Sequence, residues 1–559
     1  MDNLPILSMT AYAPLVGAVL IFALRSVKRE QARLIALVAT VVSFLLSLWM
    51  LKDFDKNAEF QYTEYVKWLP ELGVSYRMGI DGIALLLIVL TTFIGVIAVI
   101  WSWDSVNNRG REYYITVLLL QTGMLGVFMA LDLFIFYIFW ELVLIPMALL
   151  IGIWGSENRV FAAIKFFIYT LIGSLLMLIG IVATYQAYYN ATGVRTLNIL
   201  ELQTGWDKGA YSDVFQGAVF AAFLIAFAIK IPMWPFHTWL PDAHVQAPTA
   251  ASVILAAIML KMGGYGLLRF NLPLFPEGSE DWAWIIIALS LIGIIYGALV
   301  ALVQPDFKKL IAYSSVSHMG FVTLGIFTNI FLTSRSDLSG FNGSMMVMIA
   351  HGLNTGALFL LVGMLYERAH TRLIAAFGGI AGRMPFYAFF LGLFTFASIG
   401  LPGMSGFVGE FLAILSAWQY HKWIAIVAFL VVIFAAWYML SMFQRVFLGS
   451  AHHELTDHGD GLFTDEEKAM LAAHGDSHGH GHDDHGVAFA PVSGGSHDHD
   501  HDEHDSSLWP DLTRKELITL VPLAVLTIVL GIYPNPVFDI VGPSFERIMD
   551  PFLRGPLGG

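Results

Sequence analysis

The sequence of 559 residues has no cysteine, and charged residues make up only 13% of it. Without cysteine the chain cannot supply thiolate ligands, which argues against an iron–sulfur cluster held by this chain. The phosphate-binding pattern GxxxxGK[ST] and the dinucleotide-binding pattern GxGxxG are both absent, so nucleotide binding has no support. No cleavable signal-peptide pattern precedes the first apolar run, which we expect to be a retained helix.

Hydrophobic residues, by contrast, make up 57% of the chain, and the mean hydropathy is +0.69. Long apolar runs recur along nearly the whole length, as in a polytopic membrane protein. Runs of this length in lipid must be helical, because backbone polar groups find no water there. We expect about fourteen membrane-spanning helices, at residues 8–25, 33–51, 82–102, 113–131, 133–152, 162–185, 214–233, 247–269, 282–303, 309–331, 341–364, 385–418, 423–446 and 516–534.

The formal net charge of −13 comes from one segment. Residues 451–505 hold fourteen Asp and Glu and a single lysine, Lys468, whereas the rest of the chain has 29 basic and 29 acidic residues. Lys and Arg are more numerous in the loops after odd-numbered spans, sixteen against eleven on the other side. Because cytoplasmic loops carry the excess of Lys and Arg, we expect both termini outside and the acidic segment in the cytoplasm.

A small set of ionisable residues lies inside the predicted spans. A charged group at the bilayer centre costs roughly 2.5–3.5 kcal/mol by insertion scales, so such groups usually face a bundle interior and mark ion or proton paths. The alternative to a proton path is structural: a buried ion pair between Glu141 and a lysine that only fixes helix packing. Lys165 lies near a helix end, so its side chain can also reach the membrane interface. The set is Glu141, Lys165, Lys230, Lys261, His318, His351 and Glu410.

Two of the predicted helices are interrupted. The seventh ends in AIKIPMWPFHTWLPDAH, where Pro232 follows Lys230 by two residues. The twelfth, 385–418, is too long for one span and contains Gly400, Pro402 and Gly403. Irregular backbone at this depth occurs where it lines a cavity or is packed in protein. An interrupted helix in each half of a chain is typical of inverted repeats, so we interpret helices 4–8 and 9–13 as two five-helix repeats.

These side chains share one kind of chemistry. Carboxylate, lysine and histidine can all take and give protons when their surroundings change. A carboxylate that moves toward or away from a buried lysine switches that lysine between holding and releasing a proton. The pattern therefore favours a proton path that uses no metal, nucleotide or covalent intermediate.

Several long segments carry a resemblance to a known family. They are MGIDGIALLLIVLTTFI (78–94), residues 119–155 with FWELVLIPM, residues 230–269 with PFHTWLPDAH, QPDFKKLIAYSSVSHMGF (304–321) and LPGMSGFVGEF (401–411). They resemble the antiporter-like membrane chains of respiratory complex I, the proton-translocating NADH:quinone oxidoreductase. The GIDG near residue 80 and FWELVLIPM favour the M type, the counterpart of mitochondrial chain 4.

The resemblance implies a fold of fourteen helices, with helices 7 and 12 discontinuous, in a multi-pass protein of the bacterial inner membrane. It implies that Glu141 pairs with Lys230, that Lys261 is the central lysine, that Glu410 is the exit-side acid, and that His318 and His351 relay protons. His237 and His244 fall at the mouth of helix 7, as candidates for cytoplasmic uptake. FMN, iron–sulfur clusters and quinone would belong to partner subunits, with no cofactor in this chain. The L-type and N-type chains would be its neighbours.

The same interpretation divides the chain into 1–112 (three helices), 113–269 and 270–446 (the repeats), 447–510 (an insert) and 511–559 (the last helix). The insert departs from the family, which has a short loop there. It holds twelve histidines, and its composition predicts disorder apart from a short helix at 462–471. A solvated linker, a weak metal buffer and a contact with a neighbouring subunit are the alternatives for it.

Two other functions remain open from the residues. A cation/proton antiporter subunit of an Mrp system would share the lysines and glutamates inside the membrane. A metal-ion transporter is suggested by the insert, but the spans offer lysines, which repel cations, in place of a His/Asp ligand set.

Overall fold

The computed structural model describes residues 4–24, 28–106, 108–332, 334, 336–448 and 510–553. Within these residues, thirteen helices are long and apolar enough to cross a membrane. Two shorter helices follow one another where the sequence predicts the remaining, broken span. The prediction of an all-α polytopic membrane protein with about fourteen spans is confirmed. Most of the predicted insert, and the short helix expected at 462–471, lie outside the described residues.

The chain begins with three spans and an unexpected hairpin. The spans are α1 (Ile6–Ala23), α2 (Arg29–Lys52) and α3 (Gly82–Ser105). Between α2 and α3, strands β1 (Gln61–Leu69) and β2 (Val74–Ile80) pair in antiparallel fashion. The β-branched and aromatic residues of β1 favour a strand. The sequence analysis missed this hairpin because two short strands in a connection leave no long apolar run.

The first set of five spans follows, with its fourth member interrupted. Its last member is one long helix that contains two π-helical turns, Leu255–Met259 and Leu267–Asn271. A short helix, α7 (Ile199–Leu202), precedes the interrupted member. The elements are α4 (Gly110–Met129), α5 (Leu133–Trp154), α6 (Arg159–Thr192), α8 (Asp213–Lys230) with α9 (Trp239–Gln246), and α10 (Thr249–Ile254) with α11 (Leu260–Gly266) and α12 (Leu272–Leu274).

The second set also consists of five spans, and its fourth span is again interrupted. Its elements are α13 (Pro276–Leu302), α14 (Phe307–Asn329), α15 (Ser339–Ala369), α17 (Pro385–Ile399) with α18 (Ser405–Tyr420), and α19 (Lys422–Phe447), with a short α16 (Ile380–Arg383) before α17. The breaks predicted in helices 7 and 12 are therefore present. The inverted relation between the two sets, and the domain limits drawn from it, stay predictions.

The first turn of the last span, α21 (Arg514–Ile532), forms hydrogen bonds with the second set. Thr513 caps the helix and forms a capping box with Glu516. The carboxylate of Glu516 accepts two hydrogen bonds from Arg368 of α15, at 2.7 and 2.9 Å. An amphipathic helix, α22 (Asn535–Leu553), follows and buries Val537, Val541 and Phe545 on one face.

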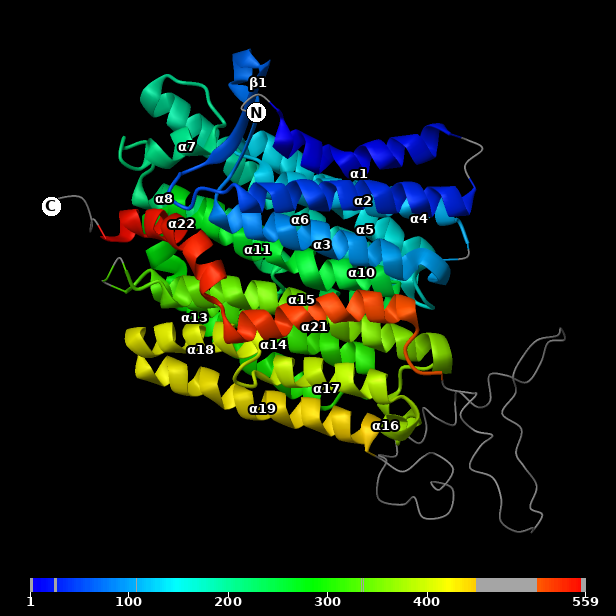
Figure 1. Ribbon diagram of the computed structural model, residues 1–559. Helices are drawn as coiled ribbons and strands as arrows, with labels where there is room; N and C mark the ends of the chain where they lie inside the picture. The colour runs from blue at the N-terminus through cyan, green and yellow to red at the C-terminus, as the bar shows by residue number, and fades with distance from the viewer. Residues whose placement is uncertain are drawn as a thin grey trace, which may run out of the picture.

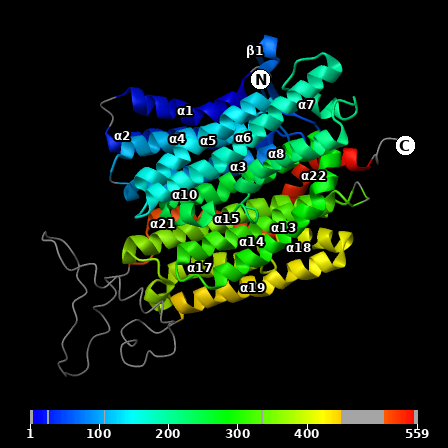
Figure 2. The same cartoon turned by 180° about the vertical axis from the view of Figure 1, so that it is seen from behind.

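The helices run side by side in one elongated block, with α1 at one end and α19 at the other (Figure 1). The view from behind shows the same order (Figure 2). The chain starts and ends on one side of this block, whereas α19 ends and α21 starts on the opposite side (Figures 1 and 2). The start of α1 and the end of α22 thus share one side of the bundle, and the end of α19 and the start of α21 share the other, in agreement with the topology expected from the sequence.

Three helices form the centre of the block. In the most apolar 18-residue stretch of each helix, every residue of the helix from Thr249 to Leu274 and of α15 is buried, and 94% of those in α14 are buried. By contrast, only 33% of the corresponding stretches in α2, α19 and α21 is buried. The three central helices carry Lys261, His318 and His351, so these side chains are shielded from lipid by the protein's own helices.

Candidate functional site

Four of the predicted site residues form one row through the centre of the protein. The Nζ atom of Lys261 lies 2.7 Å from Nδ1 of His351 and also donates to the carbonyl of Ala256. The rings of His351 and His318 have centroids 6.0 Å apart. Nδ1 of His318 lies 2.6 Å from Oε1 of Glu410. All four side chains are buried, so each can exchange a proton mainly with its neighbours in the row.

The helix that carries Lys261 is irregular on both sides of it. One π-helical turn ends at Met259, two residues before the lysine, and the other begins at Leu267. A π turn shifts the hydrogen-bond register of a helix and is frequent at functional sites. Gly263 lets this helix pack closely on α8, since a Cβ there would lie 2.7 Å from the carbonyl oxygen of Phe227. The lysine is therefore placed by local helix geometry as well as by its sequence position.

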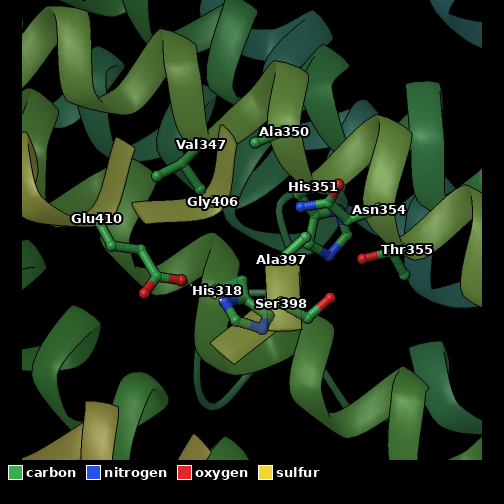
Figure 3. Close-up of a pocket in the computed structure, with 10 residues that line it drawn as sticks. All are labelled: His318, Val347, Ala350, His351, Asn354, Thr355, Ala397, Ser398, Gly406 and Glu410. Carbon is green, nitrogen blue, oxygen red and sulfur yellow. Dashed lines mark hydrogen bonds and ion pairs between the residues drawn. The ribbon is translucent and has the colours of Figure 1, made fainter. Parts of the chain in front are cut away.

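The break in helix 12 brings Glu410 to a small cavity. The cavity measures about 20 Å³, which is room for about one water molecule. Figure 3 shows Glu410 directed toward His318, with His351 and Thr355 of α15 on the other side of the cavity. Ser398, near the end of α17, completes the polar lining. The two half-helices that flank the break thus line a polar cavity, through Ala397 and Ser398 of α17 and Gly406 and Glu410 of α18, whereas the unwound residues 400–404 do not line it.

Each histidine of the row uses one ring nitrogen and leaves the other unpartnered. Nδ1 is bonded in both, whereas Nε2 of His318 and Nε2 of His351 are buried and have no hydrogen-bond partner among the described residues. Buried polar atoms of this kind are commonly satisfied by ordered water. The cavity adjoins both rings, so one water molecule there can bridge the step that has no direct hydrogen bond.

Lys230 ends α8 at the break in helix 7 and is only 2% exposed. Its ammonium lies 5.5 Å from the ring centroid of Trp140 and 5.4 Å from that of Phe166, distances typical of cation–π contacts. No hydrogen bond or ion pair joins it to Glu141, whose Oε1 is buried without a hydrogen-bond partner among the described residues. The pairing of Glu141 with Lys230 therefore stays a prediction.

Lys165 has a partner that the sequence analysis missed. Its Nζ lies 2.6 Å from Oδ2 of Asp242, on the half-helix α9. The two side chains are 26% and 38% exposed, so this ion pair lies at the surface of the isolated chain. Asp242 is the only carboxylate in PFHTWLPDAH, the segment at the mouth of helix 7, and this position was the available signal.

His237 and His244 lie at the break and on α9, as predicted. The ring of His237 packs edge-on against Tyr296, with centroids 5.1 Å apart. His244 is fully buried and stacks on Phe359 of α15, with centroids 4.5 Å apart and the planes tilted by 12°. Both ring nitrogens of His244 lack a hydrogen-bond partner within the described chain. Neither histidine touches the row directly.

Two basic residues that the sequence analysis counted as loop charges are buried. Arg269 belongs to the fully buried helix and forms an ion pair with Asp81, which caps α3. Lys308, in the first turn of α14, is 5% exposed. Apolar run length alone misses both, because each lies at a helix end. Within the described residues, no group of three or more His, Asp or Glu side chains is arranged to hold a metal ion.

Comparison with protein families places residues 130–435 in the family described as NADH:quinone oxidoreductase/Mrp antiporter, TM. The chain is 43% identical to NADH-quinone oxidoreductase subunit M of Rhodobacter capsulatus, over 93% of this chain and 91% of the relative. It is 38% identical to the subunit M of Rickettsia prowazekii, over 99% and 100%. With NADH-ubiquinone oxidoreductase chain 4 of Chondrus crispus it shares 40% identity over 97% of both.

Solved structures share the fold over the whole chain. A chain of respiratory complex I from Thermus thermophilus with bound NADH superposes with a TM-score of 0.77 at 28% identity, covering 99% of this chain and all of the other. A chain of the Mrp complex from Dietzia sp. reaches the same TM-score at 22% identity, covering 99% of both chains. The second match is evidence of a common fold only.

Proposed function

Because this chain belongs to the NADH:quinone oxidoreductase/Mrp antiporter family, as a membrane subunit of the M type in complex I, we propose that its buried row carries the translocated protons. The resemblance seen in the sequence is confirmed, and the chain is part of an enzyme complex, NADH:quinone oxidoreductase. The observation that supports the proposal is the row itself, from Lys261 through His351 and His318 to Glu410.

The geometry suggests how protons pass along the row. A proton on Lys261 moves to Nδ1 of His351, 2.7 Å away, so an N–H bond breaks on the lysine and forms on the ring. His351 then releases the proton on Nε2 into the cavity, where Nε2 of His318 takes it through water. Nδ1 of His318 passes its proton to Glu410 at 2.6 Å. Each histidine thus receives on one nitrogen and releases from the other.

Glu141 and Lys230 act as the switch in this proposal. The carboxylate holds a proton on the lysine when it is close, and the lysine releases the proton when the carboxylate withdraws. The supporting observation is that the Lys230 ammonium lies over the ring of Trp140, the residue directly before Glu141 in α5, with no hydrogen bond or ion pair between the two charged groups among the described residues. Lys165, held by Asp242, then lies beside this switch on α6.

The experiment is a substitution in the assembled complex. Lys261→Met keeps a side chain of similar length but cannot carry a proton, so NADH-driven proton pumping in membrane vesicles should fall at least about tenfold. Lys208→Met is the matched control, because Lys208 lies in the connection before α8 and its ammonium donates to the hydroxyl of Tyr188, away from the row. Normal pumping by an assembled Lys261→Met complex would contradict the proposal.

The partners are other subunits of complex I. We propose that the L-type and N-type chains flank this one. The exposure of residues Leu401, Pro402 and Gly403 supports a neighbour there, since irregular backbone at membrane depth needs protein or water around it. FMN, iron–sulfur clusters and quinone are proposed to reside in partner subunits, with no cofactor in this chain.

The chain is a multi-pass membrane protein. We propose the bacterial inner membrane, with both termini in the periplasm and the His-rich insert in the cytoplasm. The excess of Lys and Arg on one side supports this orientation. The Mrp antiporter subunit is the second candidate, favoured by the shared fold alone. Genes for redox subunits beside this one would decide for complex I.

A further inference from the structure

A second cavity opens at the side of the block where α5 ends and α14 begins. It measures about 220 Å³, and we call it the vestibule. Its lining is mixed polar and apolar, with contributions from the loop after α5, the junction of α9 and α10, the first turn of α14 and the end of α15. Its lining includes Lys308, Tyr366 and Arg372.

Lys308 is the buried cation of the vestibule. Its Nζ donates to the carbonyl oxygen of Ala247 at 2.6 Å, just after the end of α9. Arg372 donates to the carbonyl of Val245 at 2.7 Å and pairs with Asp306 at 3.3 Å. Both cations thus hold the C-terminal end of the half-helix that carries His244, where the helix dipole favours positive charge.

The vestibule and the central cavity are aligned along α15. His351 and Thr355 line the central cavity, whereas Val362 and Tyr366 line the vestibule. Thr355 and Val362 are seven residues apart, which is about 10 Å along a helix. Phe359 lies on α15 between Thr355 and Val362, and its ring stacks on the ring of His244. This stacked pair thus lies along α15 between the residues that line the two cavities.

His244 is placed near the vestibule by its own half-helix. It lies on α9, three residues before Ala247, whose carbonyl accepts the hydrogen bond from Lys308. His244 is fully buried, and both its ring nitrogens are free of protein hydrogen bonds within the described residues. Both nitrogens are thus available to a proton that comes from the side of Lys308.

We propose that the vestibule is the proton-uptake site and that Lys308 passes protons to His244, with the His244–Phe359 stack as the barrier to the central cavity. This inference rests on the proposed function, since it supplies the row at Lys261. In each transfer an N–H bond of the Lys308 ammonium breaks and an N–H bond forms on the His244 ring. The neutral amine takes its next proton from water in the vestibule.

Two substitutions of Lys308 separate a proton carrier from a structural anchor. Lys308→Arg keeps the positive charge and the donor to Ala247, but arginine does not release its proton. Lys308→Met removes both. A carrier predicts that both variants assemble and lose NADH-driven pumping at least about tenfold. Lys309→Met, one residue along and only part-buried, is the control and should pump normally.

Normal pumping by Lys308→Arg overturns the inference, whatever Lys308→Met does, because the residue then serves only as an anchor. If Lys308→Met fails to assemble, Lys308→Arg alone decides. The Lys261→Met variant tests the row separately from the uptake site. Loss of pumping there, with normal pumping in Lys308→Arg, refutes the uptake site and leaves the row intact.

The barrier is tested by opening it. Phe359→Ala should increase passive proton leak through purified complex in liposomes without NADH, measured with a pH-sensitive dye. Leu358→Ala is the control, since Leu358 is equally buried in α15 and lines neither cavity. Leak that is equal in the two variants overturns the assignment of the His244–Phe359 stack as the barrier.

Discussion

The two interrupted helices differ in how their breaks are built. In helix 7, the indole of Trp239 donates to the carbonyl of Ile229 at 2.9 Å, and the amide of Met233 donates to Ala228 at 2.8 Å. Pro232 and Pro235 bring no N–H groups that would need partners. Residues 231–233 and His237 are buried, whereas Pro235 and Thr238 are exposed, so the break is closed at the end that carries Lys230.

The break in helix 12 uses glycine instead. Gly400 and Gly403 have φ values of 84° and 91°, which a residue with a Cβ adopts only with strain. The amide of Leu401 donates to the carbonyl of Phe396, the hydrogen bond of a Schellman C-cap. Residues 401–403 are exposed. Proline thus builds a break that is buried beside a lysine, and glycine builds one with three exposed residues beside a cavity.

The largest expected effect comes from removing the charge near each break, or the carboxylate of Glu141 on α5, the proposed partner of Lys230. Lys230→Ala, Glu141→Ala and Glu410→Ala should each lower NADH-driven proton pumping at least about tenfold with the complex assembled, since each removes a proton-carrying group. Glu157→Ala, in an exposed loop, is the control. Pumping is measured in vesicles, and assembly by native gel. Normal pumping in the helix 7 variants alone would mean that only the glycine break lies on the path.

Two alanine substitutions test the packing of the glycine break. At Gly406 a Cβ would lie 2.1 Å from the carbonyl oxygen of Ala397, so Gly406→Ala should cost about 1–3 kcal/mol of stability. At Gly403 a Cβ meets nothing within 4 Å, and only the positive φ opposes it, at about 1 kcal/mol. Thermal unfolding of the purified complex gives the order. A larger loss at Gly403 would contradict the packing described here.

The ion pair beside the proline break should matter less for stability. Lys165 and Asp242 are partly exposed, so Asp242→Asn should change the free energy of unfolding by less than about 1 kcal/mol. If the pair acts as a unit, Lys165→Met, Asp242→Asn and the double variant should lower pumping to the same degree. Additive losses would show that the two residues act separately.

The smallest expected effect is that of the insert. Deleting residues 451–505 should leave NADH oxidation and pumping nearly unchanged, because both interrupted helices and the row lie outside it. Turnover of the assembled deletion variant is the measurement. An inactive or unassembled enzyme would show that the insert supports the helix 12 side of the protein.

Prediction from the sequence succeeded where a residue's signal is local. A lysine or glutamate in an apolar run, such as Lys261 or Glu410, stands out because burying a charge in lipid is costly. It failed where the signal depends on a helix end: Lys308 and Arg269 were taken for loop charges, and Asp242 was overlooked. The π turns around Lys261 also leave no mark in the hydrophobic pattern, since they depend on neighbouring helices.

The sequence by itself determined the membrane class, the spans, the two breaks and the set of ionisable residues, because hydropathy, proline and glycine act locally. Only the tertiary structure decided which of these residues meet. His351 and Lys261 are 90 positions apart, and Glu410 and His318 are 92 apart. Their contacts follow from the packing of central helices around one cavity, and packing depends on all helices at once.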